Sequence, residues 1–336
     1  MATEVAERTA MNRVGGALGN QQFILFLVWV GMVVLFSVIN PQFFSIAVAS
    51  NILADWGPVV LVAVGQLFVV ISAGIDLSVG AVAGFSGVIA ALLMRSMYSG
   101  GEGQAPWLVL LVGLIVCAGV GLAVGLVNSL LINYAKLVPF VATLVTLGAA
   151  SGLSLVITGG GPVGGGPPAA IQLSVPVIGP FSWPIIGVIV VVTIAGAFLH
   201  KARFGRYTYA LGSNSFAARA AGISVKGQIA KVYMLSGLLA GLAGYFFYLR
   251  LGSGAPTSGG GMELDAIAAV VIGGAALAGG VGRMSGTVLG ALILTTVTSG
   301  LIMIGVQPSW KRVVVAVLIA VAVAIQAARR SDARAS

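Results

Sequence analysis

A series of long apolar runs, separated by short polar intervals, constrains this chain most strongly. A membrane-spanning helix needs about 20 mostly apolar residues, because irregular backbone cannot face lipid. Ten runs approach that length, over residues 23–39, 58–74, 79–94, 107–132, 137–158, 184–200, 229–250, 264–281, 284–306 and 311–328. Residues 41–57 are less apolar, and we read them as a re-entrant or interfacial piece. The pattern predicts an all-α, polytopic membrane protein of about ten transmembrane helices.

Composition excludes a water-soluble globule. Of 336 residues, 59% are hydrophobic and 7% are charged, whereas a soluble domain carries about 25% charged residues. Glycine is abundant, and pairs spaced GxxxG let helix backbones approach closely. Such pairs occur at Gly80 and Gly84, Gly121 and Gly125, Gly237 and Gly241, and Gly286 and Gly290. We therefore expect one tightly packed transmembrane domain over residues 23–328, with short tails over 1–22 and 329–336.

The basic residues indicate how the chain is oriented. Lys and Arg outnumber Asp and Glu by 17 to 8, and the bases lie mostly between the apolar runs. If the N-terminus is cytoplasmic, only Arg95, Arg250, Lys311 and Arg312 fall outside, as the positive-inside rule requires. The pattern predicts a multi-pass protein of the inner or plasma membrane with both termini in the cytoplasm. Because the bases are not interleaved with aromatic residues, we expect lipid rather than nucleic acid as their partner.

Residues typical of enzymes are scarce. The chain has one cysteine, Cys117, and one histidine, His200, so neither a cysteine-based metal site nor a His-dependent triad is expected. It has no GxxxxGK[ST] motif, and the GxGxxG match at residues 159–164 contains proline and reads as a loop. We expect no catalytic residue, metal or cofactor, and ATP hydrolysis, if used, on a separate subunit.

The polar interval over residues 201–228 contains five bases and no acid. Within it, a short run of strong helix formers ends at a glycine, which is typical of a helix C-terminus. The run comprises Ala217, Ala218, Arg219, Ala220, Ala221, Gly222 and Ile223. A short basic helix of this kind either binds anionic lipid or docks a soluble partner.

Five motifs in order extend over most of the chain. They are Gly-Ile-Asp-Leu-Ser-Val-Gly at 74–80, Pro-Phe-Val-Ala-Thr-Leu at 139–144, Gly-Arg-Tyr at 205–207 leading to Gly-Ile at 222–223, Ser-Gly-Leu-Leu-Ala-Gly at 236–241, and Glu-Leu-Asp-Ala-Ile-Ala-Ala-Val-Val-Ile-Gly-Gly at 263–274. With these motifs the chain resembles the ribose-type permeases of ATP-binding cassette importers, a group that also takes other monosaccharides.

The resemblance implies a homodimeric pore, two cytoplasmic ATPase subunits and an external solute-binding protein, periplasmic or lipid-anchored, that delivers the sugar. It also implies that residues 217–223 form the helix that couples the permease to the ATPase. Related permeases carry branched-chain amino acids or nucleosides, so these solutes stay open. An ion-coupled secondary transporter is a less favoured alternative, because nearly every charge falls at a predicted span end.

Several polar residues are candidates for lining the pore or capping helices. Asp76, assisted by Ser78, is expected to cap the third span at its mouth, where the helix dipole favours negative charge. Glu263 and Asp265 are expected on the external side, at the start of the eighth span. The remaining candidates either line the pore or join helices: Asn128, Ser129, Asn133, Thr143, Thr146, Thr295, Thr296, Thr298 and Ser299.

Two short similar segments open the third and eighth spans. Gly-Ile-Asp-Leu at residues 74–77 and Gly-Met-Glu-Leu at 261–264 are separated by five spans. The odd number places them on opposite sides of the membrane. An inverted repeat of five helices predicts this arrangement.

Overall fold

The computed structural model of the chain describes residues 21–98, 104–307, 309–318, 320 and 324. Among these, eight helices are long and apolar enough to cross a membrane. They are α2 (Gln21–Ile39), α3 (Ile46–Ile71), α4 (Val79–Tyr98), α5 (Pro106–Asn133), α6 (Pro139–Thr158), α8 (Trp183–Lys201), α11 (Val225–Leu251) and α13 (Met284–Met303). An all-α membrane protein is therefore confirmed.

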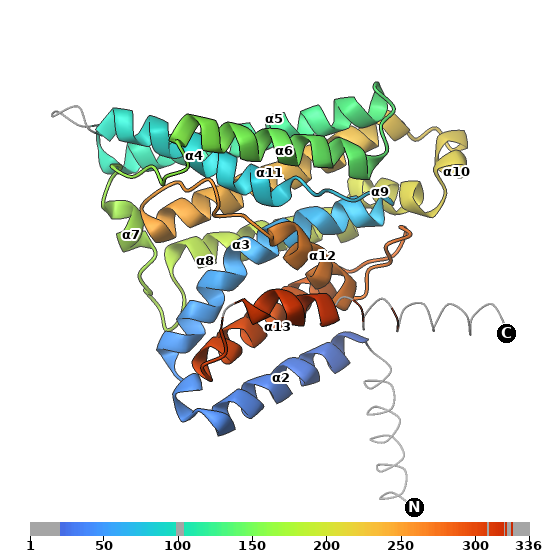
Figure 1. The fold of residues 1–336 in the computed structure, drawn as a ribbon. Coiled ribbons are helices and arrows are strands. Elements are labelled where there is room, and N and C mark those ends of the chain that lie inside the picture. Colours follow the sequence, from blue (N-terminus) through green and yellow to red (C-terminus); the bar gives the residue numbers. More distant parts are fainter. Residues whose placement is uncertain (1–20, 99–103, 308, 319, 321–323, 325–336) are drawn as a thin grey trace, which may run out of the picture.

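The shorter helices mark the two ends of the bundle. Helices α9 (Arg203–Ser213) and α10 (Ser215–Ala220) lie at one end, and α7 (Ala169–Leu173) lies at the other (Figure 1). We call these the α10 end and the α7 end. The remaining short elements are the 3-10 helix η1 (Pro41–Phe43) and α12 (Met262–Ile272).

Helix α3 forms the centre of the bundle. Every residue from Trp56 to Ile71 is buried, whereas Phe36 is the one buried residue that α2 contributes. Figure 1 shows α3 running diagonally through the molecule, with α4, α5, α6 and α11 on one side and α2 and α13 on the other. The outer helices expose apolar side chains such as Val156 and Val38, as expected for surfaces that face lipid.

Residues 41–57 do not form the re-entrant piece that we expected. After the short turn at η1, Ser45 caps α3 by accepting a hydrogen bond from the Val48 amide at 3.3 Å, and the helix continues from Ile46 without a break. Pro58 lies inside the helix and does not end it. The polar residues Ser50 and Asn51 therefore belong to the first turns of a long helix.

The predicted eighth span, 264–281, is wrong as a continuous helix. Helix α12 has 11 residues and ends at Ile272, and residues 273–283 form an irregular segment in which Gly274, Gly279 and Gly280 have positive φ. Of the predicted tenth span, residues 310–318 are helical, and most of the rest lies outside the described residues. The tails, apart from Gln21 and Gln22, also lie outside them.

The GxxxG pairs are confirmed as sites of close helix packing. A Cβ on Gly237 of α11 would overlap the Gly121 carbonyl oxygen of α5, and a Cβ on Gly121 would overlap the Gly237 carbonyl oxygen. Similarly, a Cβ on Gly286 of α13 would overlap the Gly273 carbonyl oxygen, and one on Gly84 of α4 would lie 2.8 Å from the Pro256 carbonyl oxygen. No side chain larger than hydrogen fits at these positions without backbone movement.

Candidate translocation network and coupling helix

The chain unwinds between α3 and α4. Helix α3 ends at the α10 end, where the Ile71 carbonyl accepts a hydrogen bond from the Gly280 amide at 2.9 Å. Ala73 follows with φ of 62°, a left-handed conformation that disfavours residues with a Cβ. Residues 72–78 then turn back into the bundle, and α4 begins at Val79, which is fully buried.

A second unwound segment enters from the opposite end. Helix α11 ends at the α7 end, and residues 252–261 run back along α4 before α12 begins (Figure 1). Close contacts between this segment and α4 show the path, because Gly254 lies against Gly87 and Gly259 lies against Gly80. Helices α4 and α12 thus begin beside each other inside the bundle. This antiparallel pairing is what a five-helix inverted repeat requires, and the repeat itself stays a prediction.

Asp76 lies at the point where α4 begins and makes three hydrogen bonds. The Ser78 amide and hydroxyl donate to Asp76 Oδ1 at 3.0 and 2.6 Å, and the Ser236 hydroxyl of α11 donates to Asp76 Oδ2 at 2.8 Å. All three side chains are at most 1% exposed. The carboxyl group therefore joins the unwound segment to the first turn of α4 and to α11.

The hydrogen bonds continue from Ser78 to two further helices. Asn128 of α5 donates from Nδ2 to Ser78 Oγ at 2.9 Å, and Thr146 of α6 donates to Asn128 Oδ1 at 2.6 Å. We call Asp76, Ser78, Asn128, Thr146 and Ser236 the Asp76 network. Its members are all buried and come from α5, α6, α11 and the start of α4.

Two further contacts hold the unwound segment beside this network. The Leu77 amide donates to Thr143 Oγ1 of α6 at 3.1 Å. The Tyr233 hydroxyl of α11 donates to the Ile75 carbonyl at 3.5 Å. Main-chain groups of an unwound segment need such partners, because none is available inside the segment itself.

The depth of the Asp76 network corrects the expected position of Asp76 at the mouth of a span. Asn128 lies five residues before the end of α5, and Thr146 lies seven residues after the start of α6. At 1.5 Å per residue these helices place the network about 8–11 Å inside the α10 end. The chain turns at residues 72–73, where Ala73 has φ of 62°, and then runs inward, so the carboxyl group lies deeper than the end of α3. The capping role of Asp76 stays a prediction.

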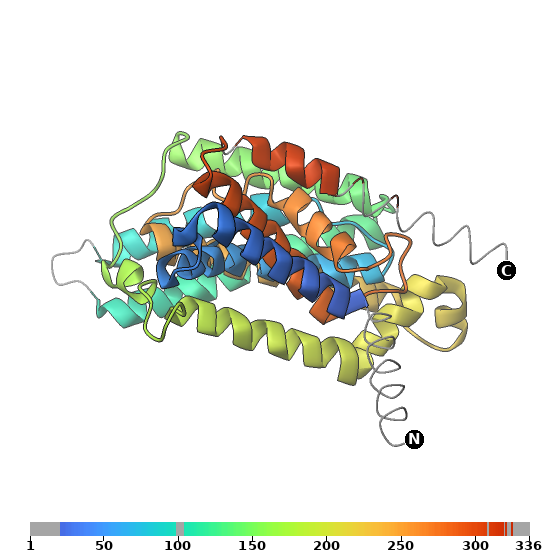
Figure 2. The same ribbon diagram turned by 90° about the horizontal axis from the view of Figure 1, so that it is seen from below.

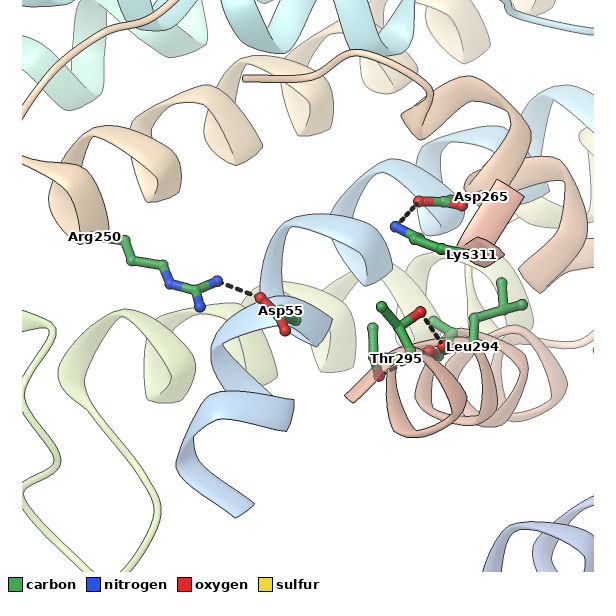
Figure 3. Close-up of polar contacts among 8 residues, drawn as sticks. Asp55, Arg250, Asp265, Leu294, Thr295 and Lys311 are labelled. Atoms are coloured by element: carbon green, nitrogen blue, oxygen red, sulfur yellow. Dashed lines mark hydrogen bonds and ion pairs between the residues drawn. The ribbon is translucent and has the colours of Figure 1, made fainter. Parts of the chain in front are cut away.

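The structure also moves Glu263 and Asp265 inward. The Glu263 carboxylate lies beside Gly80, which at 1.5 Å per residue is about 27 Å along α4 from Tyr98 near the α7 end. Asp265 is 7% exposed and accepts from Lys311 Nζ at 2.7 Å (Figure 3). Both acids lie in the first turn of α12, at the start of the predicted span, but residues 252–261 carry the chain into the bundle before that helix begins. Their location on the external side stays a prediction.

The remaining polar candidates lie apart from the Asp76 network. Asn133 donates to the Lys226 carbonyl at 3.0 Å at the α10 end. Thr296 of α13 accepts from Trp29 Nε1 of α2 at 3.0 Å and so joins two helices. The hydroxyls of Thr295 and Thr298 donate to carbonyls of their own helix, as does that of Ser129 (Figure 3 shows Thr295).

Three residues of this region were not singled out as site residues from the sequence. Ser236 lies in a quoted motif, yet its bond to a carboxylate 160 residues away has no signal in the local pattern. Gln66 of α3 is fully buried, and its amide atoms make no hydrogen bond within the described residues. Ala73 has the positive φ that glycine usually supplies.

Helix α10 is the second candidate site. Asn214 caps it by accepting from the amides of Phe216 and Ala217, both at 3.0 Å. At its other end, Gly222 has φ of 80°, and the Ile223 amide donates to the Ala218 carbonyl at 3.0 Å, which is a Schellman motif. The expected turn at Gly222 is confirmed. The helix begins two residues before the predicted run.

Exposure shows which side of α10 is free to meet a partner. Ala218 is buried against the rest of the chain at 4% exposure, whereas Phe216 is 84% exposed. Ala217, Arg219 and Ala220 are also exposed. These exposed side chains are therefore accessible for contact with another molecule.

Comparison with known proteins places these features in a family. Residues 48–323 match the family described as "Branched-chain amino acid transport system / permease component". The chain is 39% identical to the ribose import permease protein RbsC of Escherichia coli (strain K12), over 88% of this chain and 90% of that one. It is 34% identical to the D-allose transport system permease protein AlsC of the same organism, over 96% of each chain.

A third relative is the galactose/methyl galactoside import permease protein MglC of Escherichia coli (strain K12), which is 33% identical over 92% of this chain and 97% of that one. No solved structure matches the chain significantly. The family match over residues 48–323 covers both unwound segments, the Asp76 network and α10. The chain therefore belongs to the family of ATP-binding cassette importer permeases that contains the ribose, allose and galactose permeases, and it is a transport subunit rather than an enzyme.

Proposed function

We propose that this chain is the membrane-spanning subunit of an ATP-driven importer and that it carries a monosaccharide. The observation that supports this most strongly is its 39% identity to a ribose import permease over 88% of the chain. The allose and galactose permeases among its relatives have the same kind of cargo by name. The sugar is selected before it reaches this chain, by an external binding protein.

The chemistry of the Asp76 network agrees with an uncharged cargo rich in hydroxyl groups. Four of its five side chains are neutral and can both donate and accept hydrogen bonds. A sugar passing the unwound segments exchanges its bonds to water for bonds of the same kind. Broken helices that meet inside a bundle are where transporters hold their cargo, so we assign the passage to the region where α4 and α12 begin.

A branched-chain amino acid is the second candidate, because the matched family carries that description. Its cargo has both an ammonium and a carboxylate group. Asp76 is the one ionisable side chain in the network and is an acid, so the carboxylate of such a cargo meets no cationic group among these residues. Burying an unpaired charge costs several kcal/mol. The network therefore favours the monosaccharide.

Helix α10 is the element through which we expect the ATPase to act. Its exposed side presents Phe216 and Arg219, which suit a groove with an apolar floor and an acidic rim. The acid-free basic interval around it supports a cytoplasmic location for the α10 end. We place both termini in the cytoplasm, the binding protein at the α7 end, and a second copy of the chain in the pore, in the inner or plasma membrane.

Purification of the complex with its ATPase and binding protein tests this proposal. The permease is tagged, the associated proteins are identified, and the binding protein is screened by calorimetry against ribose, allose, galactose, leucine and a nucleoside. We expect at least one of the three sugars to bind, and we expect leucine and the nucleoside not to bind. Selective binding of leucine would overturn the sugar assignment and support the second candidate.

A further inference from the structure

A cavity of about 760 Å³ opens at the α10 end. Its walls come from the start of α2, the end of α8, helix α9 and the irregular segment 273–283. Figure 2 shows the beginning of α2 and the end of α8 converging beside α9. It is separate from the Asp76 network, since none of the five network residues lines it.

The cavity is basic. Arg206 of α9 and Arg283 line it together with His200, and none of the described residues that line it is acidic. Among the described residues the ion pairs are Arg250 with Asp55 and Lys311 with Asp265, so neither cavity arginine is neutralised by a carboxylate there. Two guanidinium groups without acidic partners form a site for an anion, and their planar donors match phosphate oxygens.

Hydrogen bonds fix the walls of the cavity relative to one another. The Tyr209 hydroxyl of α9 donates to the Gly282 carbonyl at 2.6 Å, and the Met284 amide donates to His200 Nε2 at 3.4 Å. The irregular segment is therefore attached to both α8 and α9. Four glycines of that segment also line the cavity, so Val281 and Arg283 are the only side chains beyond hydrogen that this wall contributes among the described residues; the glycines are Gly273, Gly274, Gly280 and Gly282.

We propose that this cavity binds the phosphate of an anionic lipid headgroup. It lies where apolar helices end, which is the depth of the headgroup layer. Its volume is in the range of sites for small organic ligands, larger than a bare phosphate ion needs. Basic pockets between transmembrane helices are known as headgroup sites. Phosphate from solution has the same chemistry, and the experiment separates the two sources.

The test uses the full-length protein, purified and delipidated in detergent. Its melting temperature is measured with added phosphatidylglycerol, with phosphatidylcholine and with inorganic phosphate. We expect phosphatidylglycerol to raise the melting temperature more than either of the others. In the double variant Arg206→Gln/Arg283→Gln, the difference between the rise with phosphatidylglycerol and the rise with phosphatidylcholine should fall to at most half of its wild-type value. An equal rise in melting temperature with millimolar inorganic phosphate would show that the cavity binds phosphate from solution. That result would overturn the lipid headgroup as its ligand.

The matched control is Lys136→Gln/Lys231→Gln, which removes the same charge from exposed bases that do not line the cavity. It should keep the full response to phosphatidylglycerol. Equal loss in the control would show a general surface-charge effect and overturn the site. If the double glutamine variant does not fold, Arg206→Lys provides the test, since it keeps the charge and loses the paired donors. If the arginine variants keep the wild-type response to lipid but no longer bind the ATPase, then Arg206 contacts the ATPase and the proposal is refuted.

Discussion

Replacing Asp76 tests whether its network holds the unwound segment in place. Three hydrogen bonds end on this carboxyl group, two from Ser78 and one from Ser236. Asp76→Ala removes all three acceptor contacts in a site with no exposure to water. Asp76→Asn keeps an acceptor oxygen for Ser78, and the Ser236 hydroxyl can rotate to accept from the new amide. The two variants therefore differ mainly in hydrogen bonding.

The expected size of the effect comes from the bond count. Side-chain hydrogen bonds within membrane proteins average about 0.6 kcal/mol and reach about 1.7 kcal/mol. Loss of three such bonds corresponds to about 2–5 kcal/mol. The two hydroxyls can turn to other acceptors, whereas the Ser78 amide cannot, so we expect Asp76→Ala to lower the free energy of unfolding by about 2–4 kcal/mol. Asp76→Asn should cost less than about 1 kcal/mol.

The assay is unfolding of the detergent-solubilised permease, followed by tryptophan fluorescence. Asp55→Ala is the matched control, because Asp55 is also an acid that bonds a residue of α11, yet its side chain is 39% exposed. An exposed ion pair contributes about 0–1 kcal/mol. Equal stability of Asp76→Ala and the wild type would refute a stabilising network. Equal losses in Asp76→Asn and Asp76→Ala would show that the charge, which both variants remove, matters there and hydrogen bonding does not.

Three further predictions concern other parts of the molecule. Gly222→Val forces a β-branched residue to φ of 80°, at a cost of about 1–3 kcal/mol. The variant permease should still insert in the membrane and dock its binding protein, but it should fail to stimulate ATP hydrolysis. Normal stimulation in reconstituted vesicles would contradict the coupling role. Gly237→Leu should lower the melting temperature strongly, because its Cβ would overlap the Gly121 carbonyl oxygen, whereas Gly148→Leu, with open space at its Cβ, should not. Equal effects would show that close α5–α11 packing is unimportant. Lys311→Met should destabilise more than the double variant Asp265→Asn/Lys311→Met, since it leaves a buried carboxylate unpaired; additive effects in unfolding measurements would argue against that pairing.

The sequence allowed much of the fold to be predicted, because apolar length alone identifies a membrane helix. The spans at 107–132 and 184–200 agree closely with α5 and α8. Close packing at GxxxG pairs and the positive φ of Gly222 were also predictable, since each depends on a glycine at one position. These features are local, and a local pattern is enough to indicate them.

The irregular segment 273–283 and the inward course of the two unwound segments were not predictable in the same way. Residues 273–281 are as apolar as a helix, and hydropathy does not distinguish helical from extended backbone when both are buried. The depth of Asp76 depends on the same distinction. Its partner Ser236 comes from a helix that the sequence separates from it by 160 residues. Contacts of this kind follow from the packing of the whole bundle.

The account as a whole depends on ATP-driven passage of a sugar through this chain. The most direct measurement is uptake of labelled sugar into vesicles that contain the permease and its ATPase, with the binding protein added outside and the sugar chosen from the ligand screen. We predict uptake that requires internal ATP and the binding protein, and that is unaffected when proton and sodium gradients are abolished. Uptake by the permease alone, driven by an ion gradient without ATP, would contradict the account and would make the buried Asp76 a candidate ion-coupling carboxylate.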